Sequence, residues 1–444
     1  MMPILRRIAI ALIIAVGAVL WLASPALAFC GFYVSQANSN LYNQASQVII
    51  ARDGDRTVLT MANDYQGDVN NFALVVPVPV LLTEEQVRVG DPTILERLDT
   101  FSAPRLVEYF DENPCAVNNI EPRLESQTNF RIVSSEDRER EDALLGVTVE
   151  SRFSVGEYDI VILSATESNG LETWLDRNGY QIPPQASELL QPYIRQEMKF
   201  FVAKVNIEAF NTREYQSLRP LMMAFESPKF MLPIRLGTAN AQQEQDLIVY
   251  LLSPKGQIEL TNYRTAQIPS DEEVPEFVQD EFGDFYKAMF QTSHDRQQRK
   301  VAFLEYAWDM GWCDPCAANP LSREELQQAG VFWLENTPNR GFANNVFITR
   351  LHLRYTRDKF PEDLQFQETG NRQNFQGRYV IRHPYQGEDD ECEAMEEYRN
   401  QLRQRQEREV ETLARLTGWD ISEIRDKVDF ANSNPKPWWH SIWN

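Results

Sequence analysis

Two cysteines separated by two residues are the sharpest chemical signal in this sequence. They occur in Cys313-Asp314-Pro315-Cys316, directly after Trp312. Closely spaced thiols of this kind exchange disulfides when one of them has a lowered pKa, which a helix N-terminus or a nearby cation can provide. The motif therefore suggests a thiol–disulfide oxidoreductase with Cys313 as nucleophile and Cys316 as resolving thiol.

The segments around this motif predict a structural role instead. The motif looks like that of thioredoxin-like proteins, whose fold needs a buried strand leading into it and a cis-proline beside it. Apolar residues over 301–308 follow helical spacing, and residues 346–356 contain no proline. We expect a turn disulfide between Cys313 and Cys316, or a bond from one of them to Cys392. The oxidoreductase is kept as the alternative.

Three cationic side chains alternate along one predicted strand. Arg350, His352 and Arg354 fall on one face of the strand expected over residues 346–356, because side chains alternate there with a period of two. On an acidic protein, such a stripe could bind a carboxylate or phosphate group. The alternative is an outer sheet face on which neighbouring Asp and Glu side chains pair with these cations.

Motifs for other chemistries are not found in the sequence. Zinc binding would need a second pair of closely spaced cysteines or a nearby His pair. The sequence has no Gly-x-Ser-x-Gly, His-Glu-x-x-His or Gly-x-Gly-x-x-Gly motif. We expect no metal, no cofactor and no catalytic residue outside the alternative redox pair. A hydrolase with a site dispersed over loops is a further alternative.

The N-terminus has the layout of a secretory signal peptide. Arg6 and Arg7 precede an apolar run over residues 8–22, which Ala26-Leu27-Ala28 closes with small residues. We therefore predict a signal peptide over residues 1–28 and a periplasmic or extracellular protein. The alternative is an uncleaved N-terminal helix that anchors the chain, because the apolar run approaches the length that spans a membrane.

Export makes disulfides the expected state of Cys30, Cys115, Cys313, Cys316 and Cys392. Closing Cys30 to Cys115 would contribute roughly 4.6 kcal/mol and closing Cys313 to Cys316 about 2 kcal/mol, because a longer loop loses more entropy on closure. The longer loop would attach the new N-terminus to the sheet. Cys392 would then be free, intermolecular or bonded to one of the others.

The composition excludes one class of partner. The chain has 43 Lys and Arg against 65 Asp and Glu, for a formal net charge of −22. A polyanion repels phosphate backbones, so we expect no nucleic-acid partner. Other partners are unknown. The aromatic tail could dock on the body, or contact a membrane peripherally through Trp438, Trp439 and Trp443.

Alternating apolar residues and turn residues predict a sheet core. Asp53-Gly54 joins strands over 47–51 and 57–61, because Asp-Gly between apolar runs is a strong hairpin signal. A second hairpin around Gly156 is expected, and the run over 72–76 is apolar on both faces, as in a central strand. Further strands are expected at residues 199–208, 221–225, 230–236, 247–252, 346–356 and 378–382.

Helical spacing is found mostly in the second half of the chain. Helices are expected over residues 94–110 with a break at Pro104, 170–177, 282–290, from the capping box at Ser322, over 388–416 with an end at Gly418, and from Asp420.

The predicted fold class is α+β: a β-rich mixed or sandwich-like sheet core decorated by short helices, with a helical C-terminal extension. The predicted segments are 29–265 (β-rich core), 266–345 (helical, with the cysteine turn), 346–385 (strands returning to the core) and 386–444 (charged helices and aromatic tail).

Several blocks of the sequence resemble a family of exported bacterial proteins catalogued as domain of unknown function 2330. The similar blocks, in chain order, are Phe29-Cys30-Gly31-Phe32, the Asp53-Gly54-Asp55 turn, and residues 71–79, 171–180, 229–236, 313–316 and 349–352. The resemblance implies export and a shared fold, and it implies no particular chemistry. We therefore expect an exported, non-catalytic binding or envelope-associated protein.

Overall fold

The structure is a computed structural model of the chain. It describes residues 32–35, 42–43, 46–62, 65–66, 72–115, 147–178, 186–206, 218–239, 244–314, 316, 318–335, 345–387 and 392–430. The predicted signal peptide, Cys30 and the tryptophans Trp438, Trp439 and Trp443 lie outside these ranges.

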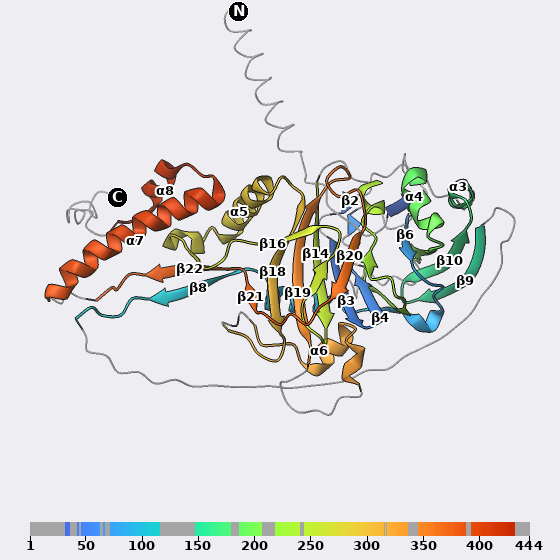
Figure 1. The fold of residues 1–444 in the computed structure, drawn as a ribbon, viewed down its shortest axis with the longest axis horizontal. Helices are drawn as coiled ribbons and strands as arrows, with labels where there is room; N and C mark the ends of the chain where they lie inside the picture. Colours follow the sequence, from blue (N-terminus) through green and yellow to red (C-terminus); the bar gives the residue numbers. More distant parts are fainter. Residues whose placement is uncertain are drawn as a thin grey trace, which may run out of the picture.

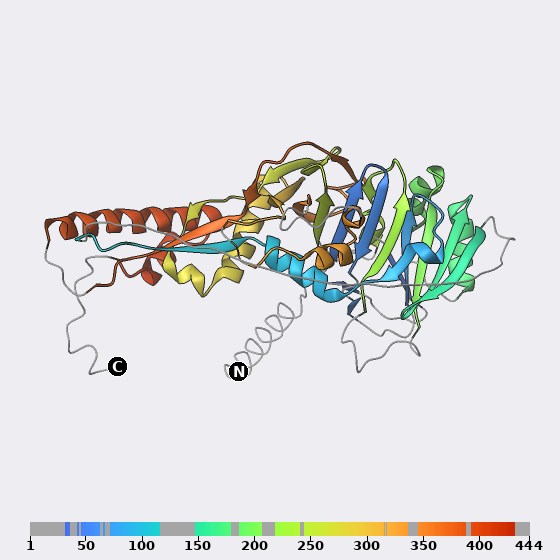
Figure 2. The same ribbon diagram turned by 90° about the horizontal axis from the view of Figure 1, so that it is seen from below.

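Two β-sheets face each other, with the larger near the middle of the molecule and the smaller at one end (Figures 1 and 2). In the ranges given above, the smaller sheet is antiparallel and has the order β1 (Phe32–Ser35), β6 (Phe72–Val78), β11 (Lys199–Val205), β10 (Tyr158–Ala165) and β9 (Val147–Val155). The larger sheet has the order β16 (Arg264–Gln267), β18 (Val301–Asp309), β19 (Phe347–Tyr355), β14 (Gln245–Ser253), β3 (Ser46–Asp53), β4 (Arg56–Met61), β12 (Leu221–Glu226) and β7 (Val87–Val89), with β21 (Phe375–Gln376) paired to β18.

Apolar side chains from both sheets fill the space between them and form the main core. The sheets are mixed, because β14 runs parallel to β3 and β16 runs parallel to β18, while the other pairs in the larger sheet are antiparallel. The α+β class with a sandwich-like sheet core is therefore confirmed.

Both predicted hairpins are present, and a glycine begins each turn. Asp53 pairs with Arg56 across Gly54, whose φ is 59°, and Val155 pairs with Tyr158 across Gly156, whose φ is 57°. A two-residue turn that fits the twist of its strands needs a positive φ at its first position, which glycine adopts without steric cost.

The predicted central strand over residues 72–76 is also present, as part of β6. It lies between β1 and β11 in the smaller sheet, so it is not a neighbour of the β3–β4 hairpin. Leu74 and Val76 face the core between the sheets, and Ala73 and Val75 face the opposite way. Burial on both faces explains why this run is apolar throughout.

Helices cover the outer faces of both sheets. The helices α3 (Ser168–Arg177) and α4 (Ala186–Arg195) and the short η3 (Leu236–Ala239) pack on the smaller sheet. The helices α2 (Pro92–Ser102) and α6 (Arg323–Gln328) and the short η5 (Phe332–Leu334) pack on the larger sheet. The remaining short elements are β2 (Tyr42–Asn43) with β5 (Tyr65–Gln66), the sheet of β13 (Met231–Leu232), β20 (Leu364–Glu368) and β15 (Ile258–Leu260), and η2 (Glu84–Gln86).

One end of the molecule projects away from the sandwich, and we call this projection the arm (Figures 1 and 2). Its parallel strands are β17 (Glu272–Glu273), β22 (Arg378–His383) and β8 (Arg105–Phe110), in that order. Its helices are η4 (Glu276–Gln279), α7 (Glu393–Thr417) and α8 (Ile421–Lys427), and α5 (Phe282–Arg296) packs at its base. Gly418 ends α7 with a φ of 76°, as predicted.

The helix predicted over residues 301–308 is wrong. These residues form strand β18, in which Val301 to Trp308 are all buried. Because β18 is covered on both faces, its sequence lacks the alternation that marks a half-buried strand, and a short apolar run cannot be distinguished from a helix by periodicity. The segment 266–345 therefore contains both helices and a central strand.

Two further predictions need correction. The helix expected over residues 94–110 ends at Ser102, and the chain after Pro104 forms strand β8. The strand expected over 230–236 is reduced to the two residues of β13. Its continuation is not a strand because the N–H groups of Ile234 and Arg235 donate to the carboxylate of Asp363, each at 3.0 Å, instead of to a neighbouring strand.

Candidate functional site

The three predicted cations lie beside two carboxylates at the centre of the larger sheet. Arg350, His352 and Arg354 on β19 are flanked by Glu305 from β18 and Asp246 from β14. The pairing of β18 with β19 shifts between residues 304 and 306, so Glu305 is an extra residue there. Such a bulge re-aims a side chain, and it accounts for a carboxylate here within an otherwise apolar strand.

The five side chains form a continuous series of ion pairs, which we call the charge ladder. Arg350 Nε lies 2.6 Å from Glu305 Oε2, and His352 Nδ1 lies 2.6 Å from Glu305 Oε1. His352 Nε2 is 3.4 Å from Asp246 Oδ1, and Arg354 donates to both oxygens of Asp246 at 2.8 Å. Charge-assisted and bidentate contacts of this kind are the strongest hydrogen bonds in proteins.

The ladder connects the sheet to two helices. Arg350 Nη1 donates to Asp99 Oδ1 of α2 at 2.7 Å, and Tyr250 Oη of β14 donates to the same oxygen at 2.8 Å. From α5, Tyr286 donates its hydroxyl to Glu305. The side chains of Arg350 and Glu305 are only 5% and 1% exposed, so this part of the ladder is shielded from water.

Burial opposes the charged forms of His352, Glu305, Asp246 and Arg350, and the opposite charges around them outweigh it. The two carboxylates raise the pKa of His352 to about 9. The cations lower the pKa of Glu305 and of Asp246 to about 2. The pKa of Arg350 is raised. Near neutral pH these four side chains are therefore charged.

This arrangement is suited to fastening the sheet to its helices. Each of Arg350, His352 and Arg354 already has a carboxylate partner, so an added anion would have to compete with Glu305, Asp246 or Asp99. The anion site at these three residues remains a prediction. The geometry agrees with the alternative of a paired face, although Arg350 and His352 are buried and Arg354 is only partly exposed.

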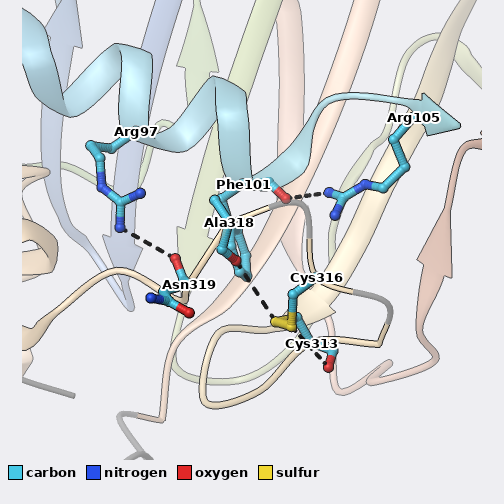
Figure 3. Close-up of a disulfide and its surroundings, with 7 residues drawn as sticks. All are labelled: Arg97, Phe101, Arg105, Cys313, Cys316, Ala318 and Asn319. Carbon is cyan, nitrogen blue, oxygen red and sulfur yellow. Dashed lines mark hydrogen bonds between the residues drawn. A yellow bond between two sulfur atoms is a disulfide. The ribbon is translucent and has the colours of Figure 1, made fainter. Parts of the chain in front are cut away.

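The second candidate is the cysteine turn. Cys313 and Cys316 form a disulfide with their Cα atoms 5.2 Å apart, so neither is bonded to Cys392. Figure 3 shows it near the end of α2, with Arg97 donating to Asn319 O at 3.2 Å. The turn follows β18 almost directly, which removes one objection to a redox role. The other objection remains, because β19 contains no proline. In addition, the next described helix, α6, begins only at Arg323 and so gives Cys313 no helix N-terminus.

The third candidate is the tip of the arm. Cys115 and Cys392 form a disulfide with their Cα atoms 6.1 Å apart, although 277 positions separate them in the sequence. Cys115 is therefore bonded to Cys392, and the bond from Cys30 to Cys115 that loop length suggested is not formed. Cys115 follows β8, and Cys392 immediately precedes α7. The disulfide thus closes the arm where β8 and β22 end.

Polar contacts inside the arm reinforce this closure. Arg405 of α7 lies 2.8 Å from Asp111 Oδ2, and Tyr398 donates its hydroxyl to the same carboxylate at 2.7 Å. These contacts outweigh the burial of Asp111 and lower its pKa. Burial raises the pKa of Glu409 to about 7, although Arg405 opposes the rise. The segment after β8 is therefore held to α7 both covalently and by hydrogen bonds.

Aromatic residues are exposed near the tip. Phe110 is 73% exposed and stacks on His383, with ring centroids 4.5 Å apart, and Tyr109 is 43% exposed. His383 lies between two carboxylates, with Nε2 2.7 Å from Glu108 and Nδ1 2.8 Å from Glu276. Burial alone would lower the pKa of His383, but the two carboxylates outweigh burial and raise this pKa.

The described ranges lack a metal-binding cluster and a membrane-spanning helix. They contain no group of three or more His, Cys, Asp or Glu residues that could hold a metal ion. None of their helices has the length and apolar character needed to cross a membrane.

Glu305, Asp246 and Asp99 were missed by sequence reasoning. Glu305 gave the clearest signal, because it is the one charged residue before the end of the apolar run of β18. A charge in such a run needs a buried partner. The partners themselves lie on strands and a helix distant in sequence, so no local pattern indicates them.

The fold and these sites together define a class: an α+β sandwich protein with a buried charge ladder and a disulfide-closed arm. The chain belongs to the family described as uncharacterized protein conserved in bacteria (DUF2330), whose model matches residues 24–367. This confirms the resemblance seen in the sequence. No curated protein and no solved structure matches the chain. The match ends within β20, so β22, Cys392 and α7 lie beyond the matched residues.

Proposed function

We propose that this protein is exported to the cell envelope and acts there by binding, with the arm as its binding element. The observation that most supports this is the Cys115–Cys392 disulfide. Such a bond forms and persists in oxidising compartments outside the cytosol. It closes the part of the molecule that lies furthest from the main core, where it can keep a projecting surface in one conformation.

The composition of the tip agrees with a binding role. Tyr109 and Phe110 are two of the few large apolar side chains that are well exposed in the described ranges. Aromatic residues are enriched at protein interfaces, because they bury a large area at a small cost in side-chain entropy. A pre-organised segment also binds with a smaller loss of entropy than a mobile one.

Export is tested by producing the full chain, with its natural N-terminus, in a bacterial host. We expect the mature protein to begin at Phe29 and to contain a Cys115–Cys392 peptide pair in mass spectrometry after digestion without reductant. A Cys115→Ser variant serves as the control for the assignment of that pair. A chain that keeps its first 28 residues and has free thiols in the cytosol would contradict the proposal.

Envelope association is tested with the tail. A chain truncated after Phe430 lacks Trp438, Trp439 and Trp443, and we expect a larger share of it in the soluble exported fraction than for the full chain. Equal partitioning of the two chains would remove the tail from the proposal and leave the arm.

A second function, thiol–disulfide exchange at Cys313 and Cys316, is favoured by one observation. The buried strand β18 ends at Asp309, shortly before the motif, as that chemistry requires of its scaffold. Measuring the reduction potential of this disulfide in the full chain decides between the two roles. A structural bond is expected below about −300 mV, and a catalytic bond between about −270 and −120 mV.

A further inference from the structure

We propose that the free edge of β8 binds an extended peptide segment rich in basic residues by β-strand addition. This inference deepens the proposed function, since it names the surface of the arm that binds and the class of its partner. It is based on the orientation of the β8 backbone, on the side chains that flank this edge and on the charge around them.

In the part of the chain that the structure describes, no strand pairs with the side of β8 that faces away from β22. β8 is the last strand in its sheet and runs parallel to β22, and Figure 1 shows it as the outermost strand of the arm. The N–H of Arg105 donates to Gly377 O at 3.1 Å, and the N–H of Asp111 donates to His383 O at 3.0 Å. In a parallel pair, alternate residues direct both backbone groups to the same neighbour. Leu106, Glu108 and Phe110 therefore direct their N–H and C=O groups away from β22.

Within the described residues, this edge carries neither a lysine, a proline nor a bulge as protection against pairing. Natural sheets protect an exposed edge with lysine, proline, a bulge or a covering segment. The strand from Arg105 to Phe110 contains no lysine and no proline, and its register with β22 is uninterrupted. Its outer half, from Glu108 to Phe110, is exposed. Main-chain pairing with an added strand is the recognition mode that such an edge permits.

The charge at the edge selects a basic partner. The carboxylates of Glu108 and Glu276 are 39% and 49% exposed, and Glu112 is also exposed. Two cations lie near them. His383 is 11% exposed and lies behind Phe110, and Arg382 is 39% exposed, lies over Tyr109 and is paired with Glu273. A strand with lysine or arginine opposite Glu108 and an apolar residue opposite Phe110 would form favourable cross-strand pairs.

A second copy of this chain is the other candidate for the edge. An antiparallel pair centred on Glu108 would place this carboxylate against its own copy, and like charges directly opposite each other destabilise a sheet. Any other register still brings two acidic tips together, and the whole chain has a net charge of −22. The charge therefore favours a basic peptide over self-association.

The test uses the oxidised full chain and a synthetic peptide about ten residues long with the repeat Lys-Thr-Val-Thr, which places a lysine and a valine two residues apart on one face. Binding is measured by fluorescence anisotropy of a labelled peptide. We expect saturable binding, at least about tenfold weaker binding when the lysines are replaced by glutamate, and a similar loss when alternate peptide nitrogens are methylated. The methylated peptide keeps its charge and loses the donors that pair with the edge.

Two variants at one position locate the binding surface. Glu108→Pro removes an N–H that points away from β22, so it leaves the ladder with β22 intact and should weaken binding at least about tenfold. Glu108→Gln keeps this N–H and should lose only the salt-dependent part of binding. Circular dichroism and the Cys115–Cys392 bond check that both variants fold.

Three outcomes would overturn the inference. They are no binding by the oxidised chain, equal binding of the methylated peptide, and a dimer in sedimentation that Glu108→Pro dissociates. Each is obtained with folded protein whose arm disulfide is formed. Failure of this inference is therefore distinguishable from failure of the proposed function, which the N-terminus and thiol state of the exported chain decide.

Discussion

At the residue scale, Glu305 determines how the centre of the larger sheet is held. Its carboxylate accepts hydrogen bonds from Arg350, His352 and Tyr286 while its side chain is 1% exposed. A buried carboxylate is costly unless such donors surround it, and breaking one member of a buried pair leaves the others uncompensated. The stability of the ladder should therefore depend steeply on this one residue.

We predict that Glu305→Gln lowers the free energy of unfolding by about 3–5 kcal/mol, because it leaves two buried cations with a neutral partner. Urea denaturation followed by tryptophan fluorescence measures the change. The matched control is Glu226→Gln, which removes the partner of Arg56 in an ion pair that is 68% and 69% exposed. The control should change stability by less than about 1 kcal/mol, and an equal effect of the two substitutions would contradict the role given to the ladder.

The ladder also predicts a pH dependence with a definite sign. The pKa of His352 is raised from 6.5 to about 9. Its contribution to the free energy of unfolding is therefore complete below pH 6.5 and is lost as the pH rises through 9. The pKa values of Glu305 and Asp246 are lowered to about 2, so their contributions are complete above their ordinary values and are lost as the pH falls toward 2. We expect the free energy of unfolding to fall by roughly 3 kcal/mol between about pH 6.5 and 9.5.

The test is urea denaturation of the wild-type chain and of His352→Gln at both pH values. The variant lacks the titrating group, so the difference between wild type and variant should shrink as the pH rises. If this difference stays constant across the range, His352 does not carry its charge in the folded state.

At the element scale, the arm shows how a long helix and a strand pair are held together away from the main core. The first half of α7 is mostly exposed, and its buried residues become frequent only after Gln406. The tip therefore depends on Cys115–Cys392 and on the contacts of Asp111 with Tyr398 and Arg405.

We predict that Cys115→Ser raises hydrogen exchange in residues 392–405 and 105–111, while exchange in the two facing sheets stays unchanged. A disulfide restrains the unfolded chain more when its loop is longer, and by this relation the bond contributes roughly 5.6 kcal/mol. Hydrogen–deuterium exchange with mass spectrometry measures the effect. The control is the double variant Cys313→Ser/Cys316→Ser, which removes a disulfide that closes only a short turn. It should leave hydrogen exchange in the arm unchanged. Faster exchange in the arm of this control would contradict the prediction.

At the scale of the whole molecule, the base of the arm shares a core with the sandwich. Val410, Leu413 and Leu416 of α7 belong to the same buried cluster as Val301 and Phe303 of β18. Because a shared core couples two regions, the base of the arm should unfold together with the larger sheet, although the tip can open by itself.

We predict that Leu413→Ala, at a fully buried position, lowers the global free energy of unfolding by about 2–5 kcal/mol. Denaturation curves from near-ultraviolet and far-ultraviolet circular dichroism should coincide. Leu402→Ala, on the same helix nearer the tip, is the control and should mainly increase local exchange in the arm. Two separate transitions for Leu413→Ala would show that arm and sandwich are independent.

Much of the fold could be predicted because its signals are local. The turns at Gly54 and Gly156, the cap at Gly418 and the capping box at Ser322 each involve only a few neighbouring residues, and all four are found where they were expected. The candidate site could be predicted only on β19, where Arg350, His352 and Arg354 alternate. Their partners could not, since a carboxylate that pairs with them has no preferred spacing in the sequence.

The sequence by itself determined that the chain is a β-rich α+β protein with a helical C-terminal extension, because turns, caps and alternation depend on neighbouring residues. Only the tertiary structure decided that β18 is a strand, that Glu305 lies between Arg350 and His352, and that Cys115 is bonded to Cys392. Each of these depends on which distant segments become neighbours when the sheets form. Burial on both faces and long-range pairing are properties of that assembly, and no short stretch of sequence contains them.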